Sequence, residues 1–166
     1  MTYKDLNKIE KLINAELSSK ISGSEINFGE LLLKTSTGEI MEVIKFLKKD
    51  KRFKFKQLID IAAIDYPNEE KRFEIVYLLL SIENNTRVKI SIKFEMDEKI
   101  PSITKLFPSG NWMEREIFDM YGIKFTNHPD LRRILTDYNF KGHPLRKDFP
   151  LTGFNEVRYS EKEKKV

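Results

Sequence analysis

Two neighbouring segments, residues 73–82 and 88–96, constrain the fold more than any other part of the sequence. The first contains the unbroken apolar run 75–80, which is typical of a strand buried on both faces. The second alternates apolar and polar residues, which predicts a strand with one dry face and one solvated face. Residues 83–86 are typical of a tight turn between them. The sequence therefore predicts an antiparallel hairpin whose first strand lies in the middle of a sheet.

The segments before this hairpin indicate two helices and two strands. Apolar residues recur at three- and four-residue steps over residues 4–18, which predicts an amphipathic helix. Ser36 and Glu39 have the spacing of a capping box and predict the start of a second helix. Residues 26–33 and 58–64 have the composition of strands. Helices followed by a run of strands predict an α+β fold, with a mixed, largely antiparallel sheet of about four strands and helices packed on it.

The composition excludes several classes of protein. The chain has 166 residues, which predicts one domain, and it has no cysteine, so it supplies no disulfide, thiolate nucleophile or thiolate ligand to a cluster. Its longest apolar run, residues 75–80, is far shorter than the ~20 residues of a membrane-spanning helix. Residues 1–5 lack the apolar core of a signal peptide, so we expect the protein to stay where it is made.

Basic side chains gather at residues 45–56, where seven lysines and arginines stand against Asp50 alone. One interpretation is a binding site for nucleic acid or lipid, in line with the net charge of +4. The other is the solvated end of the second helix, where lysine also suits the negative end of the helix dipole. We favour the second interpretation because it is the more common one.

The composition of the chain changes after Pro101, where Pro, Gly, His and Arg appear among short apolar segments. Residues 122–160 show no strand periodicity and indicate mostly loop. A structureless stretch of this length is unusual inside a compact domain and suggests a segment that a partner orders. We therefore predict an α+β domain over residues 1–121, followed by an extended, partner-binding C-terminal strap over residues 122–166, called the strap below.

One further helix is predicted immediately before the strap. Asn111 can cap its first turn, with Glu114 three residues later, and Gly122 can close it. Apolar side chains point nearly all round the residues between 111 and 122. We therefore expect this helix to be buried, or sandwiched between two surfaces.

The charged residues of this helix allow two interpretations. Glu114 and Glu116 flank its apolar face, and Arg115 and Asp119 have the i, i+4 spacing of a pair. Paired carboxylates can carry out acid–base catalysis. Charges beside a buried face also form structural ion networks, because unpaired burial is costly. We favour the structural network, since nothing else in the sequence supplies a nucleophile or an evident substrate site.

The only two histidines, His128 and His143, occur in similar settings, each followed by proline and then by a basic pair. Two imidazoles could ligate a metal, but no further ligand stands at a familiar spacing. A better interpretation is that each His-Pro pair fixes an extended turn. The basic pairs at 132–133 and 146–147 could bind carboxylates, carbonyls or phosphates. Residues 148–154 form an apolar and aromatic segment, which predicts a surface for a protein partner.

Several motifs in this region together resemble one family. Residues 114–122 are EREIFDMYG, residues 128–135 are HPDLRRIL, and residues 142–153 are GHPLRKDFPLTG. In this order they resemble the signature of the 30 kDa subunit of respiratory complex I, which is the C subunit of bacterial NADH:quinone oxidoreductase. Residues 60–67 and 71–77 also match the family.

The resemblance covers roughly residues 38–160. It implies a non-catalytic structural subunit of the peripheral, hydrophilic arm of the proton-pumping enzyme, which passes electrons from NADH through FMN and iron–sulfur centres to quinone. It implies that this chain binds no cofactor, because FMN, the clusters and quinone belong to partner subunits. The implied partners are the 49 kDa subunit and the cluster-bearing subunits, with no nucleic acid and only indirect membrane contact. The implied location is the cytoplasmic side of a bacterial inner membrane or the matrix side of a mitochondrial one. Members of the family usually continue past the position of Val166.

The last predicted helix and the strap are where we expect the partner subunits to bind. The expected interface residues are Trp112, Glu114, Arg115, Glu116, Phe118, Asp119, Tyr121, His128, Arg132, Arg133, His143, Arg146, Lys147, Asp148 and Phe149. Among them, the arginines and the lysine are expected to form ion pairs with the partners; these are Arg115, Arg132, Arg133, Arg146 and Lys147. The aromatic rings are expected to anchor the contact, because buried aromatic side chains carry much of the binding energy at protein interfaces.

Three other functions are alternatives. The first is an equivalent subunit of a complex I-related membrane-bound hydrogenase. The second is a basic RNA-binding α+β module, although RNA-binding sheets usually display two or three stacking aromatic rings and the last predicted strand offers Phe94 alone. The third is a free-standing hydrolase that uses Glu114, Glu116 or Asp119 as acid and base.

Overall fold

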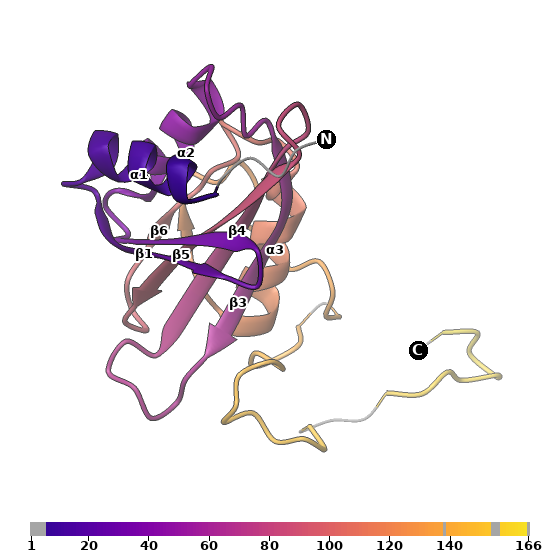
Figure 1. The fold of residues 1–166 in the computed structure, drawn as a ribbon. Coiled ribbons are helices and arrows are strands. Elements are labelled where there is room, and N and C mark those ends of the chain that lie inside the picture. The colour runs from indigo at the N-terminus through magenta and orange to yellow at the C-terminus, as the bar shows by residue number, and fades with distance from the viewer. Residues whose placement is uncertain (1–5, 138, 154–156, 166) are drawn as a thin grey trace.

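The computed structural model describes residues 6–137, 139–153 and 157–165. It contains a five-stranded sheet in the order β1-β2-β5-β4-β3 (Figure 1). The strands are β1 (Ile21–Asn27), β2 (Glu30–Thr35), β3 (Gln57–Asp65), β4 (Phe73–Ser81) and β5 (Thr86–Phe94). β2 and β5 are parallel, and the other neighbouring pairs are antiparallel. The predicted α+β class with a mixed, largely antiparallel sheet is confirmed, with one strand more than expected.

The additional strand arises because the segment predicted as one strand, residues 26–33, contains the turn of a hairpin. β1 ends at Asn27 and β2 begins at Glu30, and these two residues pair across the turn. Phe28 and Gly29 have positive φ angles of 51° and 77°. A two-residue turn with two positive φ angles matches the twist of paired strands. Phe28 rarely adopts this conformation, so the apolar pattern gave no sign of the turn.

β4 is an interior strand of the sheet, between β5 and the edge strand β3, but only one of its faces is covered. Ile75, Tyr77 and Leu79 on the inner face have no exposed surface. Val76 and Leu78, which point to the other side, are only half-buried. The prediction that this strand is buried on both faces is therefore wrong. Among the described residues, its inner-face side chains join the core with the helices, whereas its other face is only half-buried.

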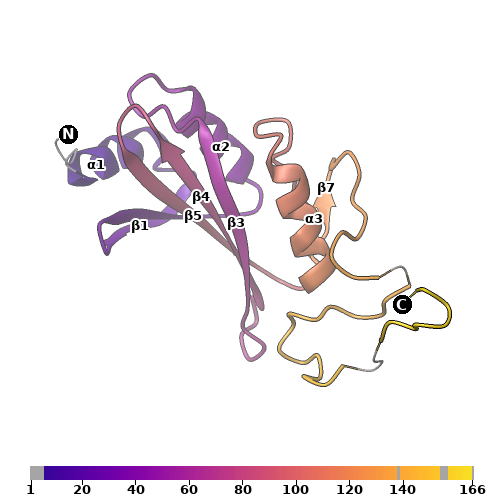
Figure 2. The same ribbon diagram turned by 90° about the vertical axis from the view of Figure 1, so that its right-hand side faces the viewer.

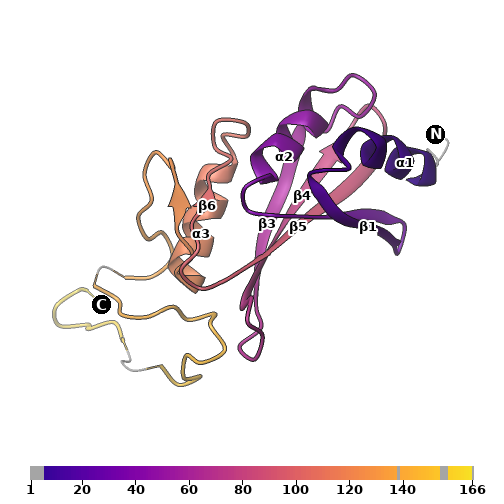
Figure 3. The same cartoon turned by 90° about the vertical axis from the view of Figure 1, so that its left-hand side faces the viewer.

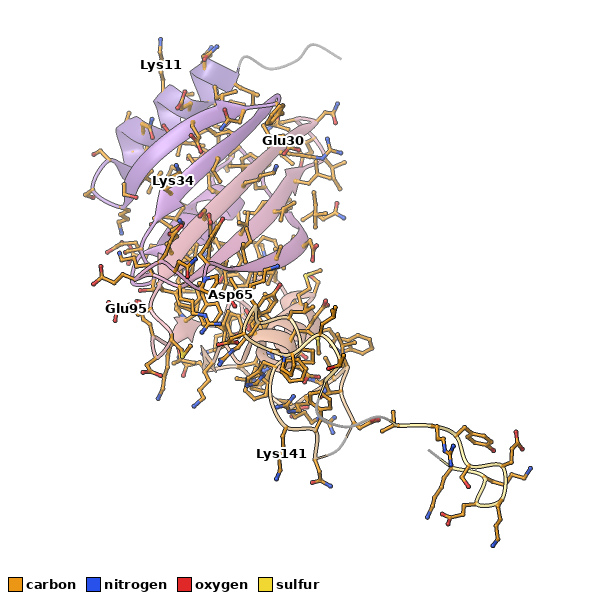
Figure 4. All side chains as sticks on the ribbon, turned by 90° about the horizontal axis from the view of Figure 1, so that it is seen from below. Lys11, Glu30, Lys34, Asp65, Glu95 and Lys141 are labelled. Atoms are coloured by element: carbon orange, nitrogen blue, oxygen red, sulfur yellow. The ribbon has the colours of Figure 1, made fainter. Side chains whose placement is uncertain are left out.

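The inner face of the sheet forms one core with α1 (Leu6–Leu17) and α2 (Ile40–Lys49). The two helices lie side by side in Figures 1 and 3. Figure 4 is seen from below, and it labels Glu30 and Lys34 of β2, which alternate with buried leucines and so belong to the open face. None of the helices in the described residues is long and apolar enough to span a membrane.

The two predicted helices are present, but the start of α2 differs from the expected capping box. The Ile40 amide donates to the backbone carbonyl of Ser36 at 3.1 Å, and no side chain caps the helix. The Glu39 carboxylate lies 3.6 Å from the Lys20 ammonium group instead. This ion pair takes the side chain that the capping box would need. Residues 4 and 5 of the predicted first helix lie outside the described residues.

The basic cluster at residues 45–56 is largely bound to the rest of the chain. Arg52 forms ion pairs with an acidic residue of α1 and with one at the end of α2. Lys54 and Lys56 share one glutamate of the β4–β5 turn. Lys48 donates to a backbone carbonyl in the segment after β5. These contacts favour the interpretation as a solvated helix end over a nucleic-acid or lipid site.

α3 (Gly110–Tyr121) packs beside β3 at the edge of the sheet (Figure 2). Two short strands, β6 (Ile100–Pro101) and β7 (Phe125–Thr126), pair in parallel next to it. From residue 127 on, the described residues contain no helix or strand, only an isolated bridge near the end of the chain. The role of the strap as a partner-binding segment stays a prediction, and its residues 138, 154–156 and 166 lie outside the described residues.

We expect the two faces of β4 to respond differently to the same substitution. Leu79→Ala removes a side chain with no exposed surface and should lower the free energy of unfolding by about 2–5 kcal/mol. Leu78→Ala, on the half-buried open face, should lower it by only about 1 kcal/mol. Urea denaturation of both variants of the full chain measures the difference. Equal losses would show that the open face is covered in solution.

Candidate interface site around helix α3

The two ends of α3 are formed by different means. The helix follows Ser109 with no side-chain cap, so the prediction that Asn111 caps it is wrong. The predicted partner in that cap, Glu114, accepts a hydrogen bond from the Ile103 amide at 2.7 Å, outside the helix. The other end is as predicted: Gly122 has a φ of 76° and its amide donates to the Phe118 carbonyl.

The Asp119 carboxylate, which is fully buried, organises the part of the strap that crosses α3. Its Oδ2 accepts hydrogen bonds from the amides of Ile134, Leu135 and Thr136 at 2.7–2.9 Å. Its Oδ1 accepts from the Thr136 hydroxyl at 2.7 Å and from Arg133 Nη1 at 2.8 Å. Burial would raise the pKa of Asp119, but the hydrogen bonds from residues 134–136 outweigh it and hold this pKa well below its usual value.

Arg115 also binds the strap, although the sequence spacing predicted that it pairs with Asp119. Its Nε and Nη2 donate to the carbonyls of Arg132 and Arg133 at 3.0 and 3.1 Å. The predicted i, i+4 pair is therefore wrong, because each partner is used by the strap instead. The helix lies between two surfaces, as predicted, and the second surface is a segment of the same chain.

Three side-chain and backbone groups of the strap bind the C-terminal end of α3. The last three carbonyls of the helix, at residues 119–121, accept from His143 Nδ1 at 2.8 Å, the Leu145 amide at 3.1 Å and Arg146 Nε at 2.6 Å. These carbonyls have no partner within a helix, so the strap completes their hydrogen bonding. A Cβ atom on Gly122 would lie 2.5 Å from the His143 ring and 2.6 Å from Arg146, so only glycine fits there.

The other histidine holds the opposite end of α3. His128 Nε2 lies 3.1 Å from the Asn111 carbonyl, and its Nδ1 accepts from the Asp130 amide at 3.0 Å. The two His-Pro turns therefore bind the two ends of the same helix. Within the part of the chain that the structure describes, no three His, Asp or Glu side chains converge on a site that could hold a metal ion.

A second junction joins the strap to the end of the sheet (Figure 4). Asp65, the last residue of β3, binds Arg72 through two hydrogen bonds of 2.7 and 2.8 Å and also accepts from the Lys147 amide at 2.8 Å. Arg72 reaches Asp148 of the strap at 2.9 Å. The hydrogen bond from Arg72 lowers the pKa of Asp65. Asp65 and Arg72 were not predicted as site residues, although both lie in the segments 60–67 and 71–77 that resemble the family.

The three carboxylates of α3 are poorly arranged for acid–base catalysis. Glu114 is fully buried, and burial raises its pKa to about 7. Asp119 has five hydrogen-bond donors on its two oxygens. Glu116 is exposed. The geometry therefore favours the structural network over catalysis.

The predicted interface residues differ in their exposure to solvent. Those exposed are Trp112, Glu116, Arg132, Lys147 and Asp148. The others are buried or half-buried, and most make the contacts described above; Phe149 stacks on Phe140 with ring centres 6.1 Å apart. Their assignment to an interface with other subunits stays a prediction. Five exposed apolar residues of the strap were not among the predicted interface residues: Leu135, Leu145, Leu151, Val157 and Tyr159. Only Leu151 lies in the segment 148–154, whose apolar character predicted a partner surface.

Comparison with known proteins identifies the family of this fold and site. Residues 33–155 match the family described as "Respiratory-chain NADH dehydrogenase, 30 Kd subunit". A relative from Xanthobacter autotrophicus, named as the C subunit of NADH-quinone oxidoreductase, is 48% identical over 161 residues, which is 97% of this chain and 77% of the relative. The chain belongs to the 30 kDa subunit family of the respiratory-chain NADH dehydrogenase. The resemblance indicated by the sequence motifs is thus confirmed.

Two solved structures are similar to this member of the 30 kDa subunit family. One is Nqo5, as its trypsin-resistant fragment (1-134), with 27% identity, a TM-score of 0.64, and coverage of 76% of this chain and 98% of that chain. The other is a chain of the membrane-bound sulfane sulfur reductase, described as an archaeal respiratory membrane complex, with 22% identity and a TM-score of 0.75. It covers 96% of this chain and 98% of that chain, and at this identity the likeness shows the fold alone.

The central role of Asp119 predicts a large loss of stability when its charge is removed. Asp119→Asn keeps the shape of the side chain but turns an amide group toward backbone donors and breaks the pair with Arg133. We expect the free energy of unfolding at neutral pH to fall by about 2–4 kcal/mol. Glu116→Gln, at an exposed carboxylate of the same helix, should change it by less than about 0.5 kcal/mol. Similar values for the two variants would contradict the assignment.

Glu114 predicts a specific pH dependence of stability. Its pKa rises from 4.5 to about 7 on folding, so its contribution is complete below pH 4.5 and is lost as pH rises to about 7. The full loss is about 3 kcal/mol, at about 1.4 kcal/mol for each pKa unit. Glu114→Gln should remove this slope, which a difference curve between the two proteins isolates from other titrating groups. Parallel curves for the two proteins would show that the pKa of Glu114 does not rise on folding.

Proposed function

We propose that this chain is a non-catalytic structural subunit of NADH:quinone oxidoreductase that binds its partner subunits through α3 and the strap. Its membership of the 30 kDa subunit family supports the assignment to this enzyme complex. One observation supports the structural role: the charged side chains of α3 hold the strap in place, while apolar side chains of the same region face outward.

The exposed apolar side chains are the groups best suited to bind a partner. Trp112 is 71% exposed, Leu135 60% and Leu151 104%, and all three belong to α3 or the strap. Exposed large apolar side chains are typical of protein interfaces, and tryptophan is among the residues that carry most of the binding energy. We therefore place the main contact on these side chains, with the exposed charged residues at its rim.

The partners that we propose are the 49 kDa subunit and the cluster-bearing subunits of the peripheral arm. In this proposal FMN, the iron–sulfur clusters and quinone are held by those subunits, and this chain supplies a surface that keeps them together. The complex would place the chain on the cytoplasmic side of a bacterial inner membrane or on the matrix side of a mitochondrial one. The names of relatives at 45–51% identity support NADH:quinone oxidoreductase over a complex I-related hydrogenase.

Exposed side chains test this function more cleanly than deletion of residues 123–159, which would also remove the groups that complete the end of α3. We expect the double change Trp112→Ser and Leu151→Ser to reduce co-purification of the partner subunits from membranes at least about tenfold, with a matching loss of quinone reductase activity. Quantitative mass spectrometry of the affinity-purified chain measures the partners.

The matched control is Ile82→Ser, which changes an apolar residue that is 68% exposed at the turn after β4. It should leave co-purification unchanged. Equal recovery of partners by both variants would overturn the proposed contact surface. Recovery of electron-input subunits other than those of NADH:quinone oxidoreductase would favour the related complex instead.

A further inference from the structure

Glu114 and His128 form a contact between two titratable groups that solvent does not reach. Neither side chain has exposed surface, and Glu114 Oε2 lies 3.8 Å from His128 Nε2. This oxygen accepts no hydrogen bond from the described residues, whereas Oε1 accepts one from the Ile103 amide. Buried polar atoms are nearly always hydrogen-bonded, so an unbonded carboxyl oxygen needs an explanation.

The hydrogen bonds of His128 determine which of its two ring nitrogens carries the proton. The Asp130 amide donates to Nδ1, so this nitrogen carries no proton. The ring proton is then on Nε2, which donates to the Asn111 carbonyl. The Nε2–H group therefore lies 3.8 Å from the unbonded carboxyl oxygen of Glu114.

The other groups that face Glu114 do not stabilise a negative charge strongly. From β4 comes the Tyr77 hydroxyl, which is fully buried and has no hydrogen-bond partner among the described residues. From the segment before α3 come the Ser102 hydroxyl and the Ile103 amide. No lysine or arginine of the described chain forms an ion pair with Glu114. Burial therefore outweighs these hydrogen bonds and raises the pKa of Glu114 to about 7.

We propose that Glu114 and His128 form a pH-sensitive hydrogen-bond switch. It determines how residues 128–130, near the beginning of the strap, pack against α3. With Glu114 protonated, the His128 ring donates to the Asn111 carbonyl, as observed. When Glu114 loses its proton to solvent, a carboxylate lies beside the same N–H, and it is a stronger acceptor than a carbonyl. The ring then turns from Asn111 toward Glu114.

This turn of the ring moves the backbone, because the opposite ring nitrogen is bound to the Asp130 amide. Residues 128–130 therefore shift relative to the first turn of α3, while the strap stays attached through Arg115 and Asp119. The switch is a property of the chain's own fold, and it goes beyond the proposed binding of partner subunits. Its test needs no partner, so its failure would leave the proposed function untouched.

Nuclear magnetic resonance of the uniformly isotope-labelled full chain tests the proposal, and its histidine signals are simple to assign because the chain has only two histidines. The structure assigns the Nε2–H tautomer to His128 and the Nδ1–H tautomer to His143, which donates to the Asp119 carbonyl. As pH rises from about 5.5 to 8.5, the ring nitrogens of His128 and the amides of residues 130–133 should shift together, with a midpoint near pH 7 that follows Glu114.

Two variants separate this switch from general effects of pH. Glu114→Gln should keep the Nε2–H tautomer and abolish the transition, whereas Glu116→Gln, the same change at an exposed carboxyl, should leave it unchanged. A transition that persists in Glu114→Gln would overturn the proposal. If Glu114→Gln does not fold, the carboxyl carbon signal of Glu114 in the unchanged chain decides: a midpoint different from that of the His128 ring also overturns it.

Discussion

Five hydrogen-bond donors converge on the Asp119 carboxylate, and the conformation of the strap depends on them. A chain without helix or strand cannot satisfy its own backbone groups, so it normally stays on the surface in contact with water. Asp119 supplies acceptors for three successive amides at residues 134–136. The Asp119 carboxylate thus accepts hydrogen bonds from strap amides, as the carbonyls of a neighbouring strand do for the amides of a strand in a sheet.

The remaining contacts of α3 extend the same principle along the helix. His128 binds its first turn, Arg115 donates to strap carbonyls beside its middle, and His143 and Arg146 donate to its last carbonyls. The helix is therefore bound along its length by its own chain before any partner is considered. Arg115, Asp119 and Arg146, which suggested catalysis or intermolecular ion pairs, are used in these contacts. The exposed apolar side chains are what a partner subunit would meet.

The elements with a regular period could be predicted from the sequence. β4 and β5 follow from an apolar run and from alternation, α1 and α2 from apolar spacing, and the end of α3 from Gly122. Each of these signals lies within a few consecutive residues. The family could also be recognised, because its motifs are continuous stretches of the sequence.

The partners within the site could not be predicted, because they are backbone groups of an irregular segment. Arg115 binds carbonyls seventeen and eighteen residues away, and Asp119 binds amides fifteen to seventeen residues away. Helical spacing rules compare only residues three or four apart, so they paired these two side chains with one another. The open face of β4 was missed for a related reason: an apolar run shows that side chains favour burial but not whether a second layer is present.

The most direct test of this account is amide hydrogen exchange of the isolated full chain at residues 134–136 and 145. The account predicts protection by a factor of at least about 100 over an unstructured peptide, because these amides are bound to α3 before any partner arrives. Exchange at the rate of an unstructured peptide would contradict it, and would mean that the partner subunits, rather than Asp119, order the strap.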